Sequence, residues 1–413
     1  MPGVSLSFPL IDGQLVTIFP AGSGKTVLSS TIIETIEQRS LDILAYFYFS
    51  IQREPVTLRE FKCSLVTQLA KGLKRPVKGQ PNWYNIPMSF KKLYMKYSPS
   101  KEPSMKDLDD VILDLLELSS EAYIVIDGLD ECVPQSLRAE VVGLLGSLSQ
   151  LDRGNTHILI ASRREPDIEA SISALPISKH VIELSVYKIN QDIQQHLNTL
   201  MKTNPFKKWS PQLKEEVIEY LTRNANGVFR WADLQIQSLA VQEREKDIRK
   251  ALKRLPKDLE ATYERILKRI ESEGKFEEAV AILRWLVFTT RPLTLMEAAE
   301  IAAFEVKDSN VLPESTDYSV AFSPGNRLLE PSSIQRILSG LVVVEDERYY
   351  RRYEMEVENW RFTDMTRAVS LAHSSVQDYL LSSTIAPQSF RLDSTNSQWF
   401  IFKSAIAYIA HYD

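Results

Sequence analysis

The sequence predicts an α/β chain in which a parallel sheet covered by helices is followed by an all-α region and a small winged-helix-like domain. In the first half, short apolar runs alternate with amphipathic stretches, which is typical of a parallel sheet with helical crossovers. After about residue 180 the apolar residues recur at helical spacing instead. The last part of the chain then has the order helix–helix–strand–strand, which suits a winged-helix-like domain.

The predicted strands are short and almost wholly apolar, as expected of strands buried on both faces. They are Leu15–Phe19, Ile43–Phe49, Tyr123–Ile126 and His157–Ala161. Between the first two, residues 27–37 carry Leu28, Ile32 and Ile36 on one face and therefore predict a helix.

In the second half of the chain, capping signals and composition predict where helices, loops and strands lie. Ser210-Pro211 predicts a helix start, and Thr294 with Glu297 forms a capping box that opens another helix. Residues 305–333 are rich in Pro, Ser, Asn and Asp and predict a long loop. Residues 341–344 and 369–372 are expected to pair as strands, and the charged stretch 345–364 between them is expected to be solvated.

Residues 243–275 are dense in charges of both signs, interleaved with apolar residues at helical spacing. One interpretation is a basic docking face. The other, which such charge runs favour, is the exposed face of packed helices. Taken together, the patterns predict the following segments: a short extension at 1–13, a parallel-sheet domain at 14–180, a helical domain at 181–275, a winged-helix-like domain at 276–390 and the start of a further helical region at 391–413.

The composition is that of an ordinary soluble protein, with 413 residues, 44% apolar and 25% charged. A net charge of −5 argues against a nucleic-acid ligand, which would favour a basic excess. Cys63 and Cys132 match no metal spacing and are expected to be reduced thiols. No apolar run is long enough to span a membrane, and the amino terminus lacks the basic flank of a signal peptide, so we expect a cytoplasmic protein.

A phosphate-binding loop lies between the first predicted strand and the first predicted helix. Glycines there let backbone N–H groups surround phosphates, the lysine reaches the β- and γ-phosphate oxygens, and the threonine hydroxyl binds Mg²⁺. The residues predicted to bind nucleotide in this loop are Ala21, Gly22, Ser23, Gly24, Lys25, Thr26 and Val27. An incidental glycine turn is the lesser alternative, because the flanking strand and helix supply the context that the motif needs.

Phe19 departs from the P-loop pattern, because it stands where the first glycine of the motif belongs. A bulky residue is strained there if the turn requires a positive φ, and nucleotide binding would then be weakened.

Three carboxylates follow the strand at residues 123–126. Asp127, at the carboxyl end of that strand, is predicted to hold the Mg²⁺ shell together with Thr26. Asp130 and Glu131 lie within a turn of it, and either one could orient or deprotonate the attacking water. An acidic loop without function is the minority interpretation.

Arg163 comes just after the next buried strand, where an arginine can sense the γ-phosphate. Its neighbour Arg164 is the weaker candidate, and for Arg164 a surface salt bridge is the favoured interpretation.

These motifs together resemble the NACHT domain of fungal NOD-like signalling proteins. The resemblance rests on Ala21-Gly-Ser-Gly-Lys-Thr26, Asp127-Gly-Leu-Asp-Glu131 and residues 162–169, and it extends through residues 224–231 and 255–266 to 371–380. It implies a signal-transduction NTPase that binds ADP or ATP with Mg²⁺, hydrolyses ATP slowly, forms homo-oligomers in the ATP state and serves self/non-self responses. Relatives of this kind usually carry an effector domain and ankyrin or WD repeats, which we do not find in these 413 residues.

The resemblance also implies two further nucleotide contacts. His373 stands where relatives direct a histidine at the β-phosphate of ADP, and it is predicted to lock the resting state. Phe229 either lines the adenine side of the site or packs in the core. The rival to the switch is a degenerate or truncated interaction protein without catalysis, which Phe19 and the short ends favour.

Overall fold

The structure is a computed structural model, and it describes residues 14–19, 24–38, 43–50, 56–73, 88–97, 102–119, 121–149, 156–175, 179–183, 185–289, 291–307, 319–346, 367–382 and 388–412. These residues form two compact units. The first unit contains the described residues up to Asn204 together with Ala225–Arg230, and the second contains Pro205–Asn224 and the residues from Trp231 onward.

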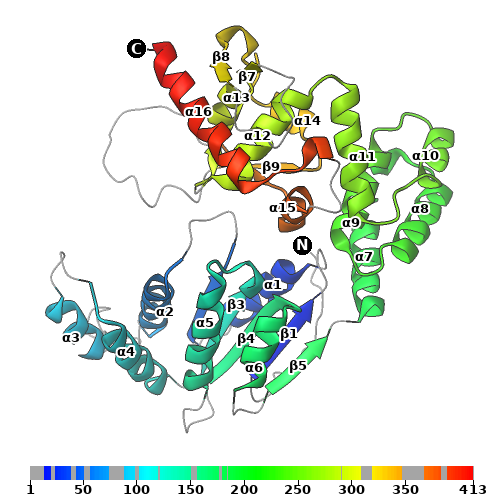
Figure 1. The fold of residues 1–413 in the computed structure, drawn as a ribbon. Coiled ribbons are helices and arrows are strands. Elements are labelled where there is room, and N and C mark those ends of the chain that lie inside the picture. Colours follow the sequence, from blue (N-terminus) through cyan, green and yellow to red (C-terminus); the bar gives the residue numbers. More distant parts are fainter. Residues whose placement is uncertain are drawn as a thin grey trace, which may run out of the picture. The chain divides into compact units, whose positions relative to one another are not determined.

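A five-stranded parallel sheet is the centre of the first unit (Figure 1). Its strands are β1 (Gln14–Phe19), β2 (Ile43–Tyr48), β3 (Ala122–Asp127), β4 (Thr156–Arg163) and β5 (Lys179–Glu183). The spatial order is β2-β3-β4-β1-β5, so β4 lies between β1 and β3. Because all strands run the same way, the loops that follow β1, β3 and β4 meet at one edge of the sheet.

Helices cover both faces of this sheet, and β3 shows the division. Ile124 and Ile126 pack in one cluster with α2, α4, α5 and α6, whereas Tyr123 and Val125 pack on the opposite face with α1. The helices of this unit are α1 (Lys25–Glu37), α2 (Leu58–Gly72), α3 (Met88–Lys96), α4 (Met105–Glu117), α5 (Gln135–Leu148), α6 (Pro166–Ser173) and α7 (Val186–Leu200). The parallel sheet with helices on both faces confirms the predicted fold class.

The second unit is helical in its first part and contains two small antiparallel sheets. Its helices are α8 (Pro211–Asn224), α9 (Phe229–Ala240, whose first two residues belong to the first unit), α10 (Glu245–Leu252), α11 (Leu259–Ser272), α12 (Phe276–Phe288), α13 (Leu295–Ile301), α14 (Ser333–Ile337), α15 (Ser374–Leu381) and α16 (Ser394–Tyr412). One core cluster joins side chains from α11 to α16.

The larger of these sheets has the order β6-β10-β9, formed by β6 (Leu293–Thr294), β9 (Val342–Asp346) and β10 (Arg367–Leu371). β9 and β10 pair antiparallel, with Val343 opposite Ser370, which confirms the predicted pairing. The predicted caps are confirmed too: α8 begins at Pro211, and Thr294 and Glu297 form a capping box at α13. Of the predicted charged stretch, residues 347–364 lie outside the described residues.

The long loop predicted at 305–333 is wrong in part: residues 323–332 contain no strand or α-helix, but strands lie before them. β7 (Phe304–Lys307) and β8 (Ser319–Phe322) pair antiparallel, and α14 begins at Ser333. The rings of Phe304 and Phe322 lie 5.2 Å apart and join the core of this unit. Contacts distant in sequence therefore form a hairpin that local composition does not indicate.

Within the described part of the chain, no helix is both long and apolar enough to cross a membrane. Cys63 and Cys132 are both free thiols, as expected from the sequence.

Candidate functional site

The phosphate-binding loop follows β1 and ends at the first residues of α1. Gly24 precedes α1 with φ of 90°, a left-handed conformation that favours glycine. A Cβ at this position would also lie 3.5 Å from Cδ2 of Phe229. Ala21, Gly22 and Ser23 lie outside the described residues, so their predicted contacts with phosphate stay predictions.

Phe19 is the last residue of β1 and lies in register with Arg163 of β4. A strand residue has an extended backbone with negative φ, and among the described non-glycine residues only Asn226 has a positive φ. The condition for strain at Phe19 is therefore not met, and the effect of Phe19 on nucleotide binding stays a prediction.

Asp127 is held by two hydroxyl groups of α1. Thr26 Oγ1 donates to Asp127 Oδ2 at 2.8 Å, and Ser29 Oγ donates to Asp127 Oδ1 at 2.8 Å. Asp127 is buried at the end of β3, and this burial raises the pKa of its carboxyl, although the two hydrogen bonds and the charge of Lys25 oppose the rise. The predicted pair of Thr26 and Asp127 is thus in direct contact.

Asp130 is the common partner of the two cations of the site. Lys25 Nζ lies 2.6 Å from Asp130 Oδ1 and 2.8 Å from Oδ2. On the other side, the backbone N–H of Arg163 donates to Oδ1 at 3.0 Å, and Arg163 Nε lies 3.1 Å from Oδ2. The side chains of Lys25 and Asp130 are 9% and 3% exposed, so this ion pair is almost out of contact with water.

The charges around Asp130 decide its protonation. Burial acts to raise the pKa of this carboxyl, but the charge and hydrogen bonds of Lys25, together with Arg163, outweigh it and hold the pKa below its usual value. Asp130 is therefore a stable anion in a site that also suits phosphate.

Two local features orient the turn from Asp127 to Glu131. Gly128 has φ of 71°, and a Cβ there would lie 2.7 Å from the backbone oxygen of Phe49, so only glycine fits. Buried Arg138 of α5 donates to the backbone oxygen of Asp130 and, through Nε, to that of Cys132 at 3.2 Å, while its Nη1 pairs with Asp167 at 3.1 Å. Arg138 thus positions the acidic turn from outside.

The other predicted site residues occupy different places. Glu131 is half-buried on the short 3₁₀ helix η2 (Leu129–Glu131), beside Asp130. Val27 is 70% exposed on α1, and Arg164 forms a surface salt bridge with Glu169 at 2.8 Å, as expected. Phe229 is half-buried next to Gly24 rather than a member of a described core cluster.

His373 belongs to the second unit, where it caps α15. Its Nδ1 accepts the backbone N–H of Ser375 at 3.1 Å and lies 2.8 Å from Ser375 Oγ. This hydrogen bond gives His373 a structural role, and its contact with ADP stays a prediction.

Ser29 and Arg138 are the site residues that sequence reasoning missed. Ser29 follows Thr26 by three positions and Lys25 by four, so helical spacing alone puts it on the same face of α1. Arg138 carries no local signal, because its partners come from η2 and α6.

Replacing Ser29 with alanine should lower the free energy of unfolding by about 1–2 kcal/mol, because a buried carboxylate oxygen of Asp127 loses its donor. Urea denaturation measures this value. Thr35→Ala is the matched control, since its exposed hydroxyl bonds only the backbone of Thr31. Equal stability of the two variants would contradict the role of Ser29.

The donor groups of the site fit a nucleoside phosphate with Mg²⁺. The Thr26 hydroxyl and the Asp127 carboxylate are oxygen ligands of the kind that Mg²⁺ prefers. Lys25 neutralises an anion already, and the first N–H groups of α1 have no carbonyl in a preceding turn. Phosphate oxygens can bind these same groups.

Comparison with known proteins agrees with this geometry. Residues 14–163 match the family model described as "Nephrocystin 3, N-terminal". The vegetative incompatibility protein HET-E-1 of Podospora anserina is 28% identical over 202 residues, which is 47% of this chain. The chain spans only 14% of the length of HET-E-1.

Two solved structures cover most of the chain at low similarity. Orc1 of Aeropyrum pernix, solved in complex with DNA, has 14% identity and a TM-score of 0.35, covering 90% of this chain and 87% of its own. Cdc6p of Pyrobaculum aerophilum has 15% identity and a TM-score of 0.35, covering 90% and 88%. Scores this low carry no information about what this chain binds.

The sequence matches are informative about the candidate site, because the family model covers the segment that contains Lys25, Asp127, Asp130 and Arg163. The family match over residues 14–163 and the similarity to HET-E-1 support a fungal NACHT-type NTPase.

Proposed function

We propose that this chain is a nucleotide-dependent switch that binds ADP and ATP with Mg²⁺ and hydrolyses ATP slowly. The observation that carries the proposal is the cluster of Lys25, Thr26, Asp127 and Asp130, in which a P-loop lysine and threonine contact the acidic turn after β3. The family relationship supports nucleotide as the ligand.

Lys25 would exchange one anion for another when nucleotide binds. Its Nζ now contacts both carboxylate oxygens of Asp130, and a phosphate that takes up the same ammonium group must compete with them. Arg163 would keep Asp130 neutralised after Lys25 has turned to the phosphates. Asp130 would therefore position Lys25 and Arg163 before the nucleotide binds.

Thr26 and Asp127 would hold Mg²⁺, directly or through water. Ser29 supports this by fixing the other oxygen of the Asp127 carboxylate. Bound Mg²⁺ would neutralise phosphate charge and orient the γ-phosphate. Of the two candidate bases, Glu131 suits the attacking water better, because Asp130 is paired with two cations and its lowered pKa makes it a weak base.

Purified full chain, denatured without added nucleotide, should release ADP or ATP that chromatography identifies. Calorimetry with Mg²⁺ then gives both dissociation constants. A chain that carries no nucleotide and binds neither one would support the rival, a non-catalytic interaction protein.

We further propose that His373 favours the ADP state, following the resemblance. Because His373 also caps α15, alanine there should cost about 1 kcal/mol of stability through the lost cap. Asparagine is the informative replacement, since it restores a cap but not the imidazole. His373→Ala and His373→Asn should both weaken ADP binding more than ATP binding in calorimetry. If the ratio of the two constants stays unchanged in both variants, His373 is only a cap.

The biological setting in this proposal comes from the family alone. On this basis we propose that the protein is cytoplasmic, that it acts in signalling or in a self/non-self response, and that it forms homo-oligomers in the ATP state. Neither nucleic acid nor membrane is a proposed ligand.

A further inference from the structure

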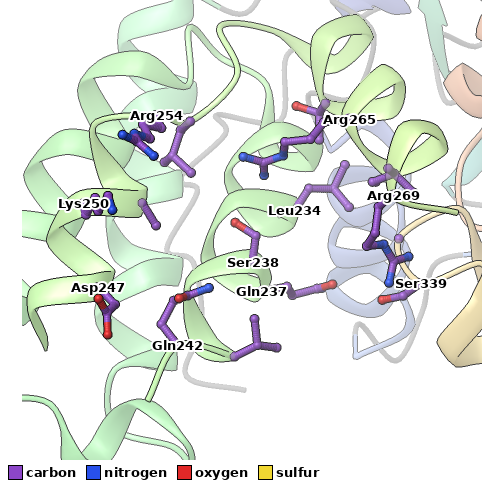
Figure 2. A pocket seen from close by; sticks show the side chains of 16 residues that line it. Leu234, Gln237, Ser238, Gln242, Asp247, Lys250, Arg254, Arg265, Arg269 and Ser339 are labelled. Atoms are coloured by element: carbon purple, nitrogen blue, oxygen red, sulfur yellow. The ribbon is translucent and has the colours of Figure 1, made fainter. Parts of the chain in front are cut away.

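A basic groove lies in the second unit, independent of the nucleotide site. It is a cavity of 720 Å³ lined by residues of α9, α10 and α11, by the segments after α9 and α10, and by the turn at Ser339 and Gly340 (Figure 2). Gly340 packs closely against two other lining residues: its φ is 86°, and a Cβ there would lie 3.1 Å from both Ile266 Cδ1 and Leu234 Cδ2.

The groove concentrates positive charge in a chain whose net charge is −5. Lys250 and Arg254 lie on one side and Arg265 and Arg269 on the other (Figure 2), whereas Asp247 is the only carboxylate among the lining residues. These cations belong to the charged segment at residues 243–275, for which the sequence allowed either a docking face or a solvated helix face.

These cations are largely without counterions. Among the described residues, Lys250 and Arg254 have no ion pair. Arg265 donates only to the amide oxygen of Gln235, at 3.3 Å. Arg269 donates to the backbone oxygen of Ile337 at 3.3 Å and lies 3.8 Å from a carboxylate oxygen of Glu273. Of the four cations, only Arg269 therefore has a partner along its own helix, at a longer distance than the 2.6 Å between Lys268 and Glu264 on the exposed side of α11.

The rest of the lining narrows the class of ligand. Leu234, Leu255, Ile266 and the 75% exposed Val241 supply aliphatic surface between the cations. Among the described residues, no aromatic ring lines the groove, so these residues lack the stacking surface that single-stranded nucleic acid and nucleotide bases use. A small polyphosphate would satisfy the cations but leave the aliphatic surface without a partner.

We infer that this groove binds an acidic peptide segment that also carries aliphatic side chains. Glutamate or aspartate side chains would pair with Lys250, Arg254 and Arg265, while a leucine-like side chain covers Val241 and Ile266. This is the arrangement by which arginine clusters recognise acidic motifs. A partner protein of this chemistry would be recognised by side chains of the second unit.

The test uses the full chain and a mixture of short synthetic peptides, each containing several glutamates and leucines in varied order. The peptides retained by the immobilised chain are identified by mass spectrometry, and the dissociation constants of the strongest are measured by fluorescence anisotropy. Lys250→Glu combined with Arg254→Glu should weaken binding at least about tenfold, because like charges would then face each other. Both side chains are exposed and unpaired, so folding should persist, and Lys250→Gln with Arg254→Gln is the milder second variant.

The matched control is Lys246→Glu with Lys253→Glu, which changes the net charge equally on the same helix and its cap but outside the groove. It should leave the affinity nearly unchanged. Val241→Ser, and separately serine in place of leucine in the peptide, should each weaken binding and so establish the aliphatic contact.

Three results would overturn the inference. The first is that the chain retains no peptide. The second is that the glutamate variant of Lys250 and Arg254 and the control variant of Lys246 and Lys253 weaken binding equally, which would indicate only diffuse electrostatic attraction. The third is that inorganic tripolyphosphate or short single-stranded DNA displaces the peptide more readily than a second acidic peptide does, which would make phosphate the ligand.

Discussion

Lys25→Ala is expected to lower the affinity for ADP and ATP by about 100-fold, which corresponds to about 3 kcal/mol for a hydrogen-bonded charge. Lys25 Nζ is the only ammonium group that contacts the acidic turn in the described residues, and alanine supplies neither charge nor donor. Calorimetry with Mg²⁺ measures both constants.

Lys62→Ala is the matched control, because Lys62 is also a buried lysine in an ion pair of the same unit, with Asp109 at 2.6 Å. Both variants should lose stability, but only Lys25→Ala should lose nucleotide. Equal affinity in wild type and Lys25→Ala would reject the assignment of the phosphate site, whatever happens to the melting temperature.

Asp130→Asn is expected to lower the stability of the nucleotide-free chain but to raise its affinity for ADP. Without nucleotide, the free energy of unfolding should fall by about 3 kcal/mol, because the nearly buried ammonium of Lys25 and the guanidinium of Arg163 lose their shared carboxylate. With ADP, affinity should rise about tenfold, because phosphate no longer competes with a carboxylate for Lys25. Consequently the rise in melting temperature on adding ADP should be larger than in wild type.

Glu131→Gln is the comparison for Asp130→Asn, since it neutralises the neighbouring carboxylate, the better candidate base, and keeps the size of the side chain. It should slow ATP hydrolysis without raising the affinity for ADP. An Asp130→Asn variant that binds ADP more weakly than wild type would contradict competition and indicate that Asp130 helps to hold the nucleotide. Unchanged stability would contradict the burial of the ion pair.

The strands and the two site motifs could be predicted because their signals are local. An almost wholly apolar run predicts a buried strand, as the residues of β3 do, and a Gly-Ser-Gly-Lys-Thr string between strand and helix predicts its own chemistry. Caps at α8 and α13 are likewise set by residues three or four positions apart. β5 and the β7–β8 hairpin carry no such signal, because each is stabilised by strands that lie elsewhere in the sequence.

The sequence alone predicts which residues come together at the candidate site: Lys25 and Thr26 at the start of a helix, Asp127 and Asp130 after one strand, and Arg163 after another. How these side chains pair depends on the fold. The order β2-β3-β4-β1-β5 puts β4 between β1 and β3, so that Asp130 meets a lysine 105 positions away and an arginine 33 positions away. Asp130 thereby becomes an ion-pair partner and leaves Glu131 as the better base, because removal from water favours pairing of nearby opposite charges and no local pattern records it.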